Sequence, residues 1–87
     1  MYVIVVYDVN VDRVNKVRIF LKQYLNWVQN SVFEGELTKS ELSIVEHAVQ
    51  ELINQSEDSV RIYVLRSDKY LEMIEVGTSK VDVSEII

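Results

Sequence analysis

The hydrophobic positions of the chain follow two periods, one typical of strands and one typical of helices. Residues Tyr2–Tyr7 form an uninterrupted apolar run rich in Val and Ile, which predicts a central strand that is buried on both faces. From Arg13 to about Asn26, apolar residues return every three or four positions. This spacing predicts an amphipathic helix with Asp12 as its N-cap.

The middle of the chain predicts paired strands and a second helix. Residues 28–37 alternate apolar and polar and are interrupted at Gly35, which indicates either two short strands or one bulged strand. Thr38 and Glu41 have the spacing of a capping box, and a second amphipathic pattern follows them. We expect this second helix to end near Gln55.

The C-terminal third predicts further strands. Residues 59–66 and 71–77 read as two strands, and residues 80–87 form a last alternating or extended piece. The element order predicts an α+β fold, a ferredoxin-like βαββαβ domain with an additional C-terminal strand. Its antiparallel sheet would carry both helices on one face, and residues 1–87 would form a single domain.

This architecture leaves one sheet face without a cover. In a chain of 87 residues, an open face and a surplus strand both favour a homodimer. We expect the strand at about residues 78–87 to be exchanged between the two copies. Its apolar residues Val81, Val83 and Ile86 would lie in the dimer interface.

The composition narrows the possible chemistry. The chain has no cysteine and one histidine, which excludes a disulfide framework, a thiolate metal site and a multi-histidine zinc site. The N-terminal apolar run is too short to span a bilayer and lacks the features of a signal peptide. The sequence therefore predicts a cytoplasmic protein with no membrane partner. His47 falls opposite the apolar stripe of the second helix, where we expect a solvated surface residue rather than a general base.

Basic residues gather on the first helix of this acidic chain, which has a net charge of −5. Four of its nine basic residues, Arg13, Lys16, Arg18 and Lys22, lie within ten positions, on both shoulders of the apolar stripe. A solvated helix surface is one interpretation. The other is a nucleic-acid interface in which Arg13, Lys16 and Arg18 contact phosphates. The acidic second helix would suit a protein partner with basic patches.

Three oxygen-bearing side chains, Asp8, Asn10 and Asp12, follow the first strand. They match half of an EF-hand loop, but Arg13 stands where that loop needs glycine. Asn10 and Asp12 are typical of a turn and a helix cap. Asp8 could be merely the polar end of the strand, or a catalytic metal ligand held rigidly there. If two copies of Asp8 face each other across a two-fold axis, Mg²⁺ or, as a second candidate, Mn²⁺ would hold them together.

Several segments together resemble a known family. The apolar strand ending in "YD", the basic first helix, the segment "QNSVFEGEL" and the alternating C-terminal piece are similar to the small CRISPR-associated adaptation protein family. Members of this family are partners of the CRISPR integrase in spacer acquisition. The resemblance covers essentially the whole chain. One departure is Trp27, which stands where many members carry a basic residue.

The resemblance implies a ferredoxin-like homodimer whose C-terminal strands pair across the dimer. It also implies two possible roles. One is a metal-dependent nuclease that acts on RNA or DNA, with Asp8 as the metal ligand. The other is a non-catalytic bridge that holds integrase dimers and the incoming DNA. The expected nucleic-acid partners are RNA and double-stranded DNA. From the residues themselves, Tyr7 is either a core or interface ring or, because it lies beside Asp8, a residue that could reach a phosphate. The sequence leaves both roles open, as it leaves open whether RNA or DNA is the substrate.

Overall fold

The computed structural model of the chain describes residues 1–66 and 71–78. The predicted C-terminal strand, with Val81, Val83 and Ile86, therefore lies outside the described residues apart from Thr78. The elements, in chain order, are β1 (Tyr2–Asp8), α1 (Val11–Leu21), β2 (Asn26–Gln29), β3 (Val32–Glu36), α2 (Lys39–Leu52), β4 (Ser59–Leu65) and β5 (Leu71–Gly77).

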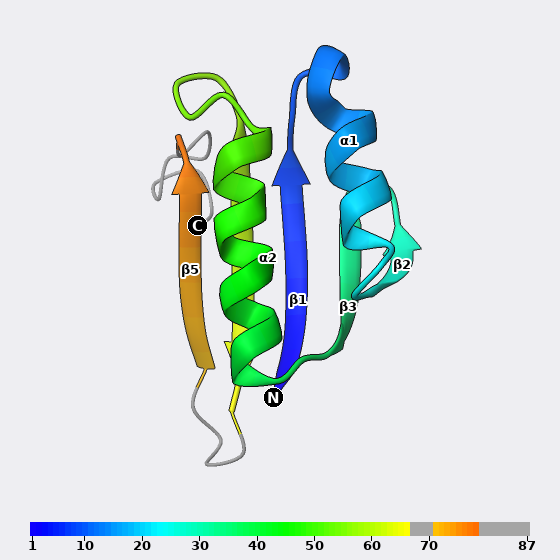
Figure 1. Ribbon diagram of the computed structural model, residues 1–87, viewed down its shortest axis with the longest axis vertical. Helices are drawn as coiled ribbons and strands as arrows, with labels where there is room; N and C mark the ends of the chain where they lie inside the picture. The colour runs from blue at the N-terminus through cyan, green and yellow to red at the C-terminus, as the bar shows by residue number, and fades with distance from the viewer. Residues whose placement is uncertain (67–70, 79–87) are drawn as a thin grey trace, which may run out of the picture.

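The strands form one antiparallel sheet in the order β2-β3-β1-β4-β5. The central strand β1 pairs with β3 from Tyr2↔Glu36 to Val6↔Val32, and with β4 from Tyr2↔Leu65 to Asp8↔Ser59. Both helices cover the same face of this sheet (Figure 1). The predicted α+β, ferredoxin-like arrangement with both helices on one face is confirmed.

Burial alternates along the central strand. Val3, Val5 and Tyr7 of β1 lie beneath the helices and are buried, whereas Ile4 and Val6 on the opposite face are 36% and 38% exposed. The prediction that β1 is buried on both faces was therefore wrong for the single chain, because no element within the described residues covers the second face. The fully buried apolar side chains are Val3, Val5, Val17, Leu21, Phe33, Val45, Val49, Val60, Ile62 and Val64.

Helix α1 begins and ends earlier than its periodicity predicts. Its N-cap is Asn10 rather than Asp12, because the Asn10 side chain accepts a hydrogen bond of 3.0 Å from the Asp12 amide. After Leu21 the chain leaves the helix through turns, yet the Leu25 amide still donates to the Leu21 carbonyl at 2.8 Å. Leu25 is buried as well. The apolar spacing thus continues past the helix, and for that reason the predicted end near Asn26 was too late.

The segment after α1 forms two strands, as one of the two interpretations predicted. The irregularity lies between Trp27 and Gln29 on β2, and the turn to β3 passes through Asn30 in the left-handed region, with φ 41°. Gly35 does not interrupt β3, and it pairs with Val3 in β1. A Cβ at Gly35 would lie 3.3 Å from the Leu25 side chain, so the glycine makes room for close packing.

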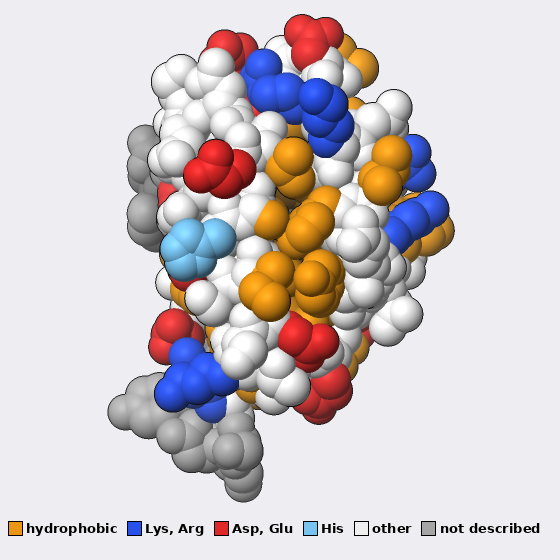
Figure 2. All heavy atoms as spheres, viewed as in Figure 1, with side chains coloured by type: hydrophobic (Ala, Val, Ile, Leu, Met, Phe, Trp, Pro, Cys, Tyr) orange, Lys and Arg blue, Asp and Glu red, His pale blue; other side chains and the backbone are white. Residues whose placement is uncertain are grey.

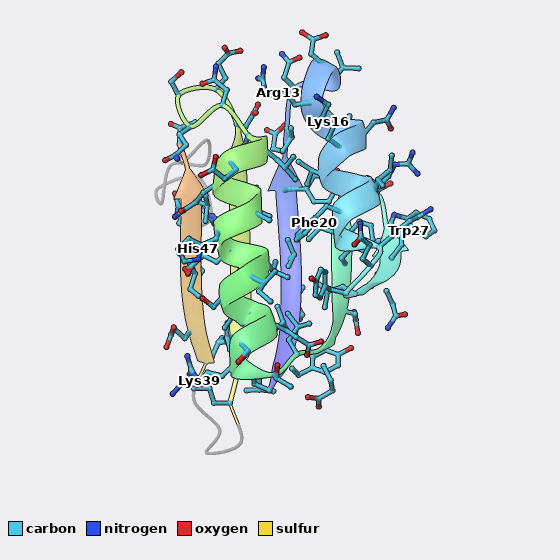
Figure 3. All side chains as sticks on the ribbon, in the orientation of Figure 1. Arg13, Lys16, Phe20, Trp27, Lys39 and His47 are labelled. Carbon is cyan, nitrogen blue, oxygen red and sulfur yellow. The ribbon has the colours of Figure 1, made fainter. Side chains whose placement is uncertain are left out.

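Helix α2 starts with the predicted capping box. The Thr38 hydroxyl accepts from the Glu41 amide at 3.1 Å, and the Glu41 carboxylate accepts from the Thr38 amide at 2.8 Å. Lys39 begins this helix at the end of the molecule opposite Arg13 and Lys16 (Figure 3). Neither helix in residues 1–66 and 71–78 is long and apolar enough to cross a membrane.

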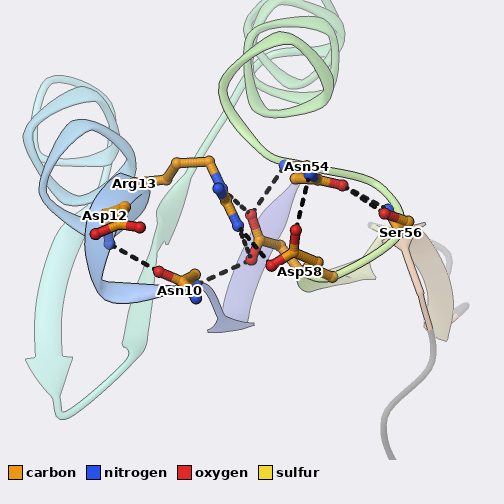
Figure 4. A network of polar contacts seen from close by, with 7 residues as sticks. Asn10, Asp12, Arg13, Asn54, Ser56 and Asp58 are labelled. Carbon is orange, nitrogen blue, oxygen red and sulfur yellow. Dashed lines mark hydrogen bonds and ion pairs between the residues drawn. The ribbon is translucent and has the colours of Figure 1, made fainter.

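A buried carboxylate joins the start of α1 to the loop between α2 and β4 (Figure 4). The side chain of Asp58 is 0% exposed and accepts four hydrogen bonds. Oδ1 accepts from the Asn10 amide at 2.9 Å and from Arg13 Nη2 at 3.1 Å. Oδ2 accepts from Arg13 Nε at 2.6 Å and from the Asn54 amide at 2.9 Å.

These donors hold Asp58 ionised. The hydrogen bonds from Arg13 lower the pKa of the Asp58 carboxyl far below its ordinary value, and the amides of Asn54 and Asn10 act in the same direction against the cost of burial. The backbone is fixed here too, since the Asp58 carbonyl accepts from the Thr78 amide at 2.9 Å. Asp58 thus anchors the β1–α1 loop, the end of α2 and the end of β5 at one point.

We expect Asp58→Asn to lower the free energy of unfolding by on the order of 3 kcal/mol, measured by urea denaturation. All four partners of Asp58 are N–H donors, and an amide side chain can accept on one atom only. Glu57→Gln is the matched control, because the Glu57–Arg13 ion pair is long, at 3.6 Å, and exposed. An equal loss of stability in both variants would contradict a special role for Asp58.

The same carboxylate predicts how stability depends on pH. Because folding lowers the pKa of Asp58 below its unfolded value of about 3.9, the folded state gains stability above that value and loses it as the pH falls. The difference in unfolding free energy between wild type and Asp58→Asn should be constant above about pH 5 and should shrink steadily toward pH 2. A difference that does not change over this range would show that the Asp58 pKa is not lowered.

Candidate metal and nucleic-acid site

Asp8 is the last residue of β1, and its surroundings are well fixed. Its backbone lies opposite Ser59 of β4, and the amide of the preceding Tyr7 donates to the Ser31 carbonyl at 3.1 Å. Two residues further on, the Asn10 amide is bound to Asp58. The chain is therefore held on both sides of Asp8, while the Asp8 side chain itself is exposed. This agrees with the prediction of a rigidly placed carboxylate at a strand end.

The donor chemistry of Asp8 fits magnesium. In residues 1–66 and 71–78, no group of three or more His, Asp or Glu side chains is placed to hold a metal ion. Magnesium does not require such a cage, since it keeps several waters and is usually bound by one or two carboxylates together with substrate phosphates. An exposed carboxylate at the end of a rigid strand meets that requirement.

Tyr7 belongs to the core rather than to the surface of the site. Its side chain is 5% exposed, and its ring stacks on Phe33 with a centroid distance of 6.1 Å. Burial raises the pKa of its hydroxyl, which keeps the phenol neutral. The interpretation of Tyr7 as a core ring is supported, because the ring is buried between the sheet and the helices. The suggested phosphate contact of Tyr7 stays a prediction.

Arg13 is engaged within the fold. Its guanidinium binds Asp58 through two hydrogen bonds and lies 3.6 Å from the carboxylate of Glu57. Because the Arg13 guanidinium is bound to one carboxylate and lies close to a second, little of its charge is available to a phosphate. A phosphate contact by Arg13 stays a prediction, but it would compete with the interaction that anchors α1.

Lys16 and Arg18 are exposed on different sides of α1. Two positions along a helix turn the side chains by about 200°, so the two cations cannot face one bound phosphate. Figure 2 shows Lys and Arg side chains in separate groups on the helix face, one at the top between the helices, others at the outer edge of α1 and one at the lower end of the molecule. Arg18 Nη2 donates to Asn15 at 3.0 Å, a contact with a neutral side chain.

Two residues that the sequence analysis did not name as site residues lie beside Arg18. Lys22, the C-cap residue of α1, and Trp27 of β2 line an open hollow of about 260 Å³ together with Arg18. Trp27 lies beyond the end of α1 on the β2 side of the molecule (Figure 3). The signals in the sequence were the place of Lys22 in the basic group and the departure at Trp27. Neither could show that the two residues meet, because their placement depends on the turn between α1 and β2.

His47 lies on the solvent side of α2, as predicted, with Nδ1 3.0 Å from the Ser43 carbonyl of the preceding turn. The imidazole is therefore at the helix surface (Figure 3). The predicted interface residues Val81, Val83 and Ile86 lie outside the described part of the chain.

Comparison with known proteins agrees with this fold. The family model described as CRISPR associated protein Cas2 matches residues 1–73. Proteins named CRISPR-associated endoribonuclease Cas2 from Methanosarcina acetivorans and Pyrococcus furiosus are 56% and 51% identical over the full length of both chains. A crystal structure of Cas2 matches with a TM-score of 0.74 and 48% identity over 95% of each chain. Streptococcus pyogenes Cas2 at pH 6.5 matches with a TM-score of 0.70 and 35% identity, over 78% of this chain and 89% of the other. The chain belongs to the CRISPR-associated protein Cas2 family.

Proposed function

We propose that the protein is a magnesium-dependent endonuclease of CRISPR adaptation that hydrolyses phosphodiester bonds in RNA, in DNA or in both. The observation that carries the proposal is the exposed carboxylate of Asp8 at the rigid end of the central strand. The relatives named endoribonucleases, which match the full length of the chain, support it. In this role the protein would act in the cytoplasm.

Asp8 would hold the metal. Magnesium, when bound, polarises a phosphodiester oxygen and lowers the pKa of a coordinated water, and this supplies a nucleophile without a histidine. Manganese could replace it, because it accepts the same oxygen ligands. The role of Asp8 would be to hold one carboxylate in a fixed position. The hydrogen bond from the Asn10 amide to the Asp58 carboxylate limits the movement of the loop that follows Asp8.

The exposed cations of α1 would position the substrate. Lys16 and Arg18 would contact phosphates, a kind of binding that depends little on sequence and falls as the salt concentration rises. Arg13 would contribute indirectly, by anchoring the start of the helix that carries them.

The working form would be a homodimer. Ile4, Val6 and Met73 are exposed on the sheet face opposite the helices, and Leu65 and Leu71 lie at the end of the same face. Such an apolar area is typical of an interface. A two-fold axis through this face would bring the two central strands together and would place two Asp8 carboxylates in one assembly.

An alternative function is a non-catalytic bridge that holds CRISPR integrase dimers and the incoming DNA. The charge of α2 favours it. Glu46 and Glu51 on this helix would repel DNA but would suit a protein partner with a basic surface. The two functions share the dimer and the nucleic-acid contacts, and they differ in whether Asp8 takes part in cleavage.

We expect Asp8→Asn to reduce cleavage of labelled RNA or DNA by about two orders of magnitude or more, because a bound metal contributes several kcal/mol to the transition state. Substrate affinity should persist or rise, since a negative charge near the phosphates is lost. Removal of magnesium with EDTA should abolish cleavage in wild type, and added Mg²⁺ or Mn²⁺ should restore it. Gel assays of cleavage and binding measure both quantities.

Asp12→Asn is the matched control for this experiment. Asp12 is also exposed and lies four residues from Asp8, but in the first turn of α1. Equal cleavage by wild type and Asp8→Asn would overturn the catalytic role. Absence of any cleavage by pure wild type, together with intact integration activity of Asp8→Asn, would favour the bridge.

We expect Ile4→Glu to convert the dimer into a monomer, as measured by sedimentation equilibrium. Ile4 lies opposite Glu34 and Tyr63 on the open face, so the new carboxylate would be buried in the interface beside an existing one. Ile44→Glu is the control, because Ile44 is similarly exposed but lies on α2. A dimer that survives Ile4→Glu unchanged would place the interface elsewhere.

A further inference from the structure

The hollow beside the end of α1 combines an aromatic surface with positive charge. It is lined by Arg18 of α1, by the C-cap residue Lys22 and by Trp27 of β2, and its volume is about 260 Å³. The indole of Trp27 is 56% exposed, although tryptophan is a side chain that proteins usually bury to a large extent. An exposed indole that lines one hollow together with two cations is suited to a ligand that has both a flat ring and a negative charge.

The indole is already held in place. Its Nε1 donates to the Asn30 carbonyl at 2.9 Å, across the turn between β2 and β3. This bond satisfies the polar edge of the ring and leaves its flat faces for contacts. Because the ring needs little further ordering, a ligand that stacks on it loses less binding energy to side-chain entropy.

The two cations are placed to act together. Lys22 is the C-cap of α1 and keeps helical backbone angles, so it lies on the same side of the helix as Arg18, four residues earlier. In the described part of the chain neither forms an ion pair, and the hydrogen bond of Arg18 goes to the neutral Asn15. Their charges are therefore available to an anion, unlike that of Arg13.

We propose that this hollow binds one unpaired nucleotide of a single strand, with its base stacked on Trp27 and its phosphate bound by Arg18 and Lys22. Stacking needs a base face that is free, whereas both faces of a base within a duplex are covered by neighbouring base pairs. The hollow is slightly smaller than pockets for drug-sized ligands, about 300–1,000 Å³, and therefore suits one nucleotide rather than several. The proposal rests on the proposed nucleic-acid binding but not on cleavage.

The experiment uses Trp27 as its own reporter, because it is the single tryptophan of the chain. The full-length protein is titrated in EDTA with oligouridylate, with oligothymidylate and with a blunt duplex, each of about 12 nucleotides or base pairs, a length within the site sizes common for single-strand binding. We expect quenching of tryptophan fluorescence by the single strands and little quenching by the duplex. Stronger quenching by oligouridylate would assign the site to RNA. Stronger quenching by oligothymidylate would assign it to DNA.

Variants then test the residues one at a time, with affinity measured by anisotropy of a labelled oligonucleotide. Trp27→Ala should weaken single-strand binding about ten-fold, whereas Trp27→Phe, which keeps an aromatic face, should retain most of it. Duplex affinity should change less than about two-fold in both. Ile44→Ala, which removes an exposed apolar side chain from α2, is the matched control.

The charges are tested in the same way. Arg18→Ala combined with Lys22→Ala should reduce the salt dependence of single-strand binding, and Lys39→Ala at the start of α2 should not. A change in stability alone would alter neither the salt dependence of binding nor the difference between single-strand and duplex affinity.

Several results would overturn the proposal. These are the absence of quenching by either single strand, and an equal loss of single-strand and duplex affinity in Trp27→Ala. Binding of the duplex without quenching by single strands would overturn the stacking site alone, whereas no binding of any nucleic acid would overturn the proposed function as well. If Trp27→Ala does not fold by circular dichroism, the wild-type quenching and Trp27→Phe still decide.

Discussion

Both helices pack on the same face of the five-stranded sheet, and this one-sided packing determines most other features of the molecule. It buries Val3 and Val5 of the central strand and leaves Ile4 and Val6 exposed on the opposite face. The core of the single chain is thus complete on one side only. An apolar face on a small domain is stabilised most readily by a second copy, and for this reason the proposed dimer and the proposed site are linked through the same central strand.

The Asp58 contacts distinguish two kinds of charge near the site. The ion pair between Asp58 and Arg13 lies inside the fold. The four hydrogen bonds that Asp58 accepts, two of them from Arg13, fix the loop after Asp8. The charges of Lys16, Arg18 and Lys22 lie at the surface, where they are open to phosphates. A group of basic residues that looks uniform in the sequence is therefore divided between anchoring a helix and contacting a ligand, and only the surface members should influence the salt dependence of binding.

The sequence was sufficient for the element order, the capping box of α2 and the placement of both helices on one face, because each depends on local periodicity or spacing. The sequence was less informative where a tertiary contact changes the structure that local preference alone predicts. Asn10 rather than Asp12 caps α1, since the Asn10 amide is fixed by a residue far along the chain. Arg13 and Asp58 could not be paired by spacing, and the hollow at Trp27 depends on a turn whose geometry no motif encodes. The position of Asp8 at the end of β1 was predictable because a polar residue that ends an apolar run is visible in the sequence alone, whereas its role as a metal ligand stays a prediction.

The long-range character of the Asp58 contacts has a consequence for the order of folding. Its bonds to Asn10 and Arg13 span 48 and 45 residues, so the loop between them must close before either bond can form. Helix α1 has 11 residues, which is short for a helix that is stable in isolation. Pairing of Asp8 in β1 with Ser59 in β4 closes the same loop, so we expect β1 and β4 to pair before α1 becomes fixed. The surface that carries Lys16 and Arg18 would then be among the last parts of the molecule to form and the first to open.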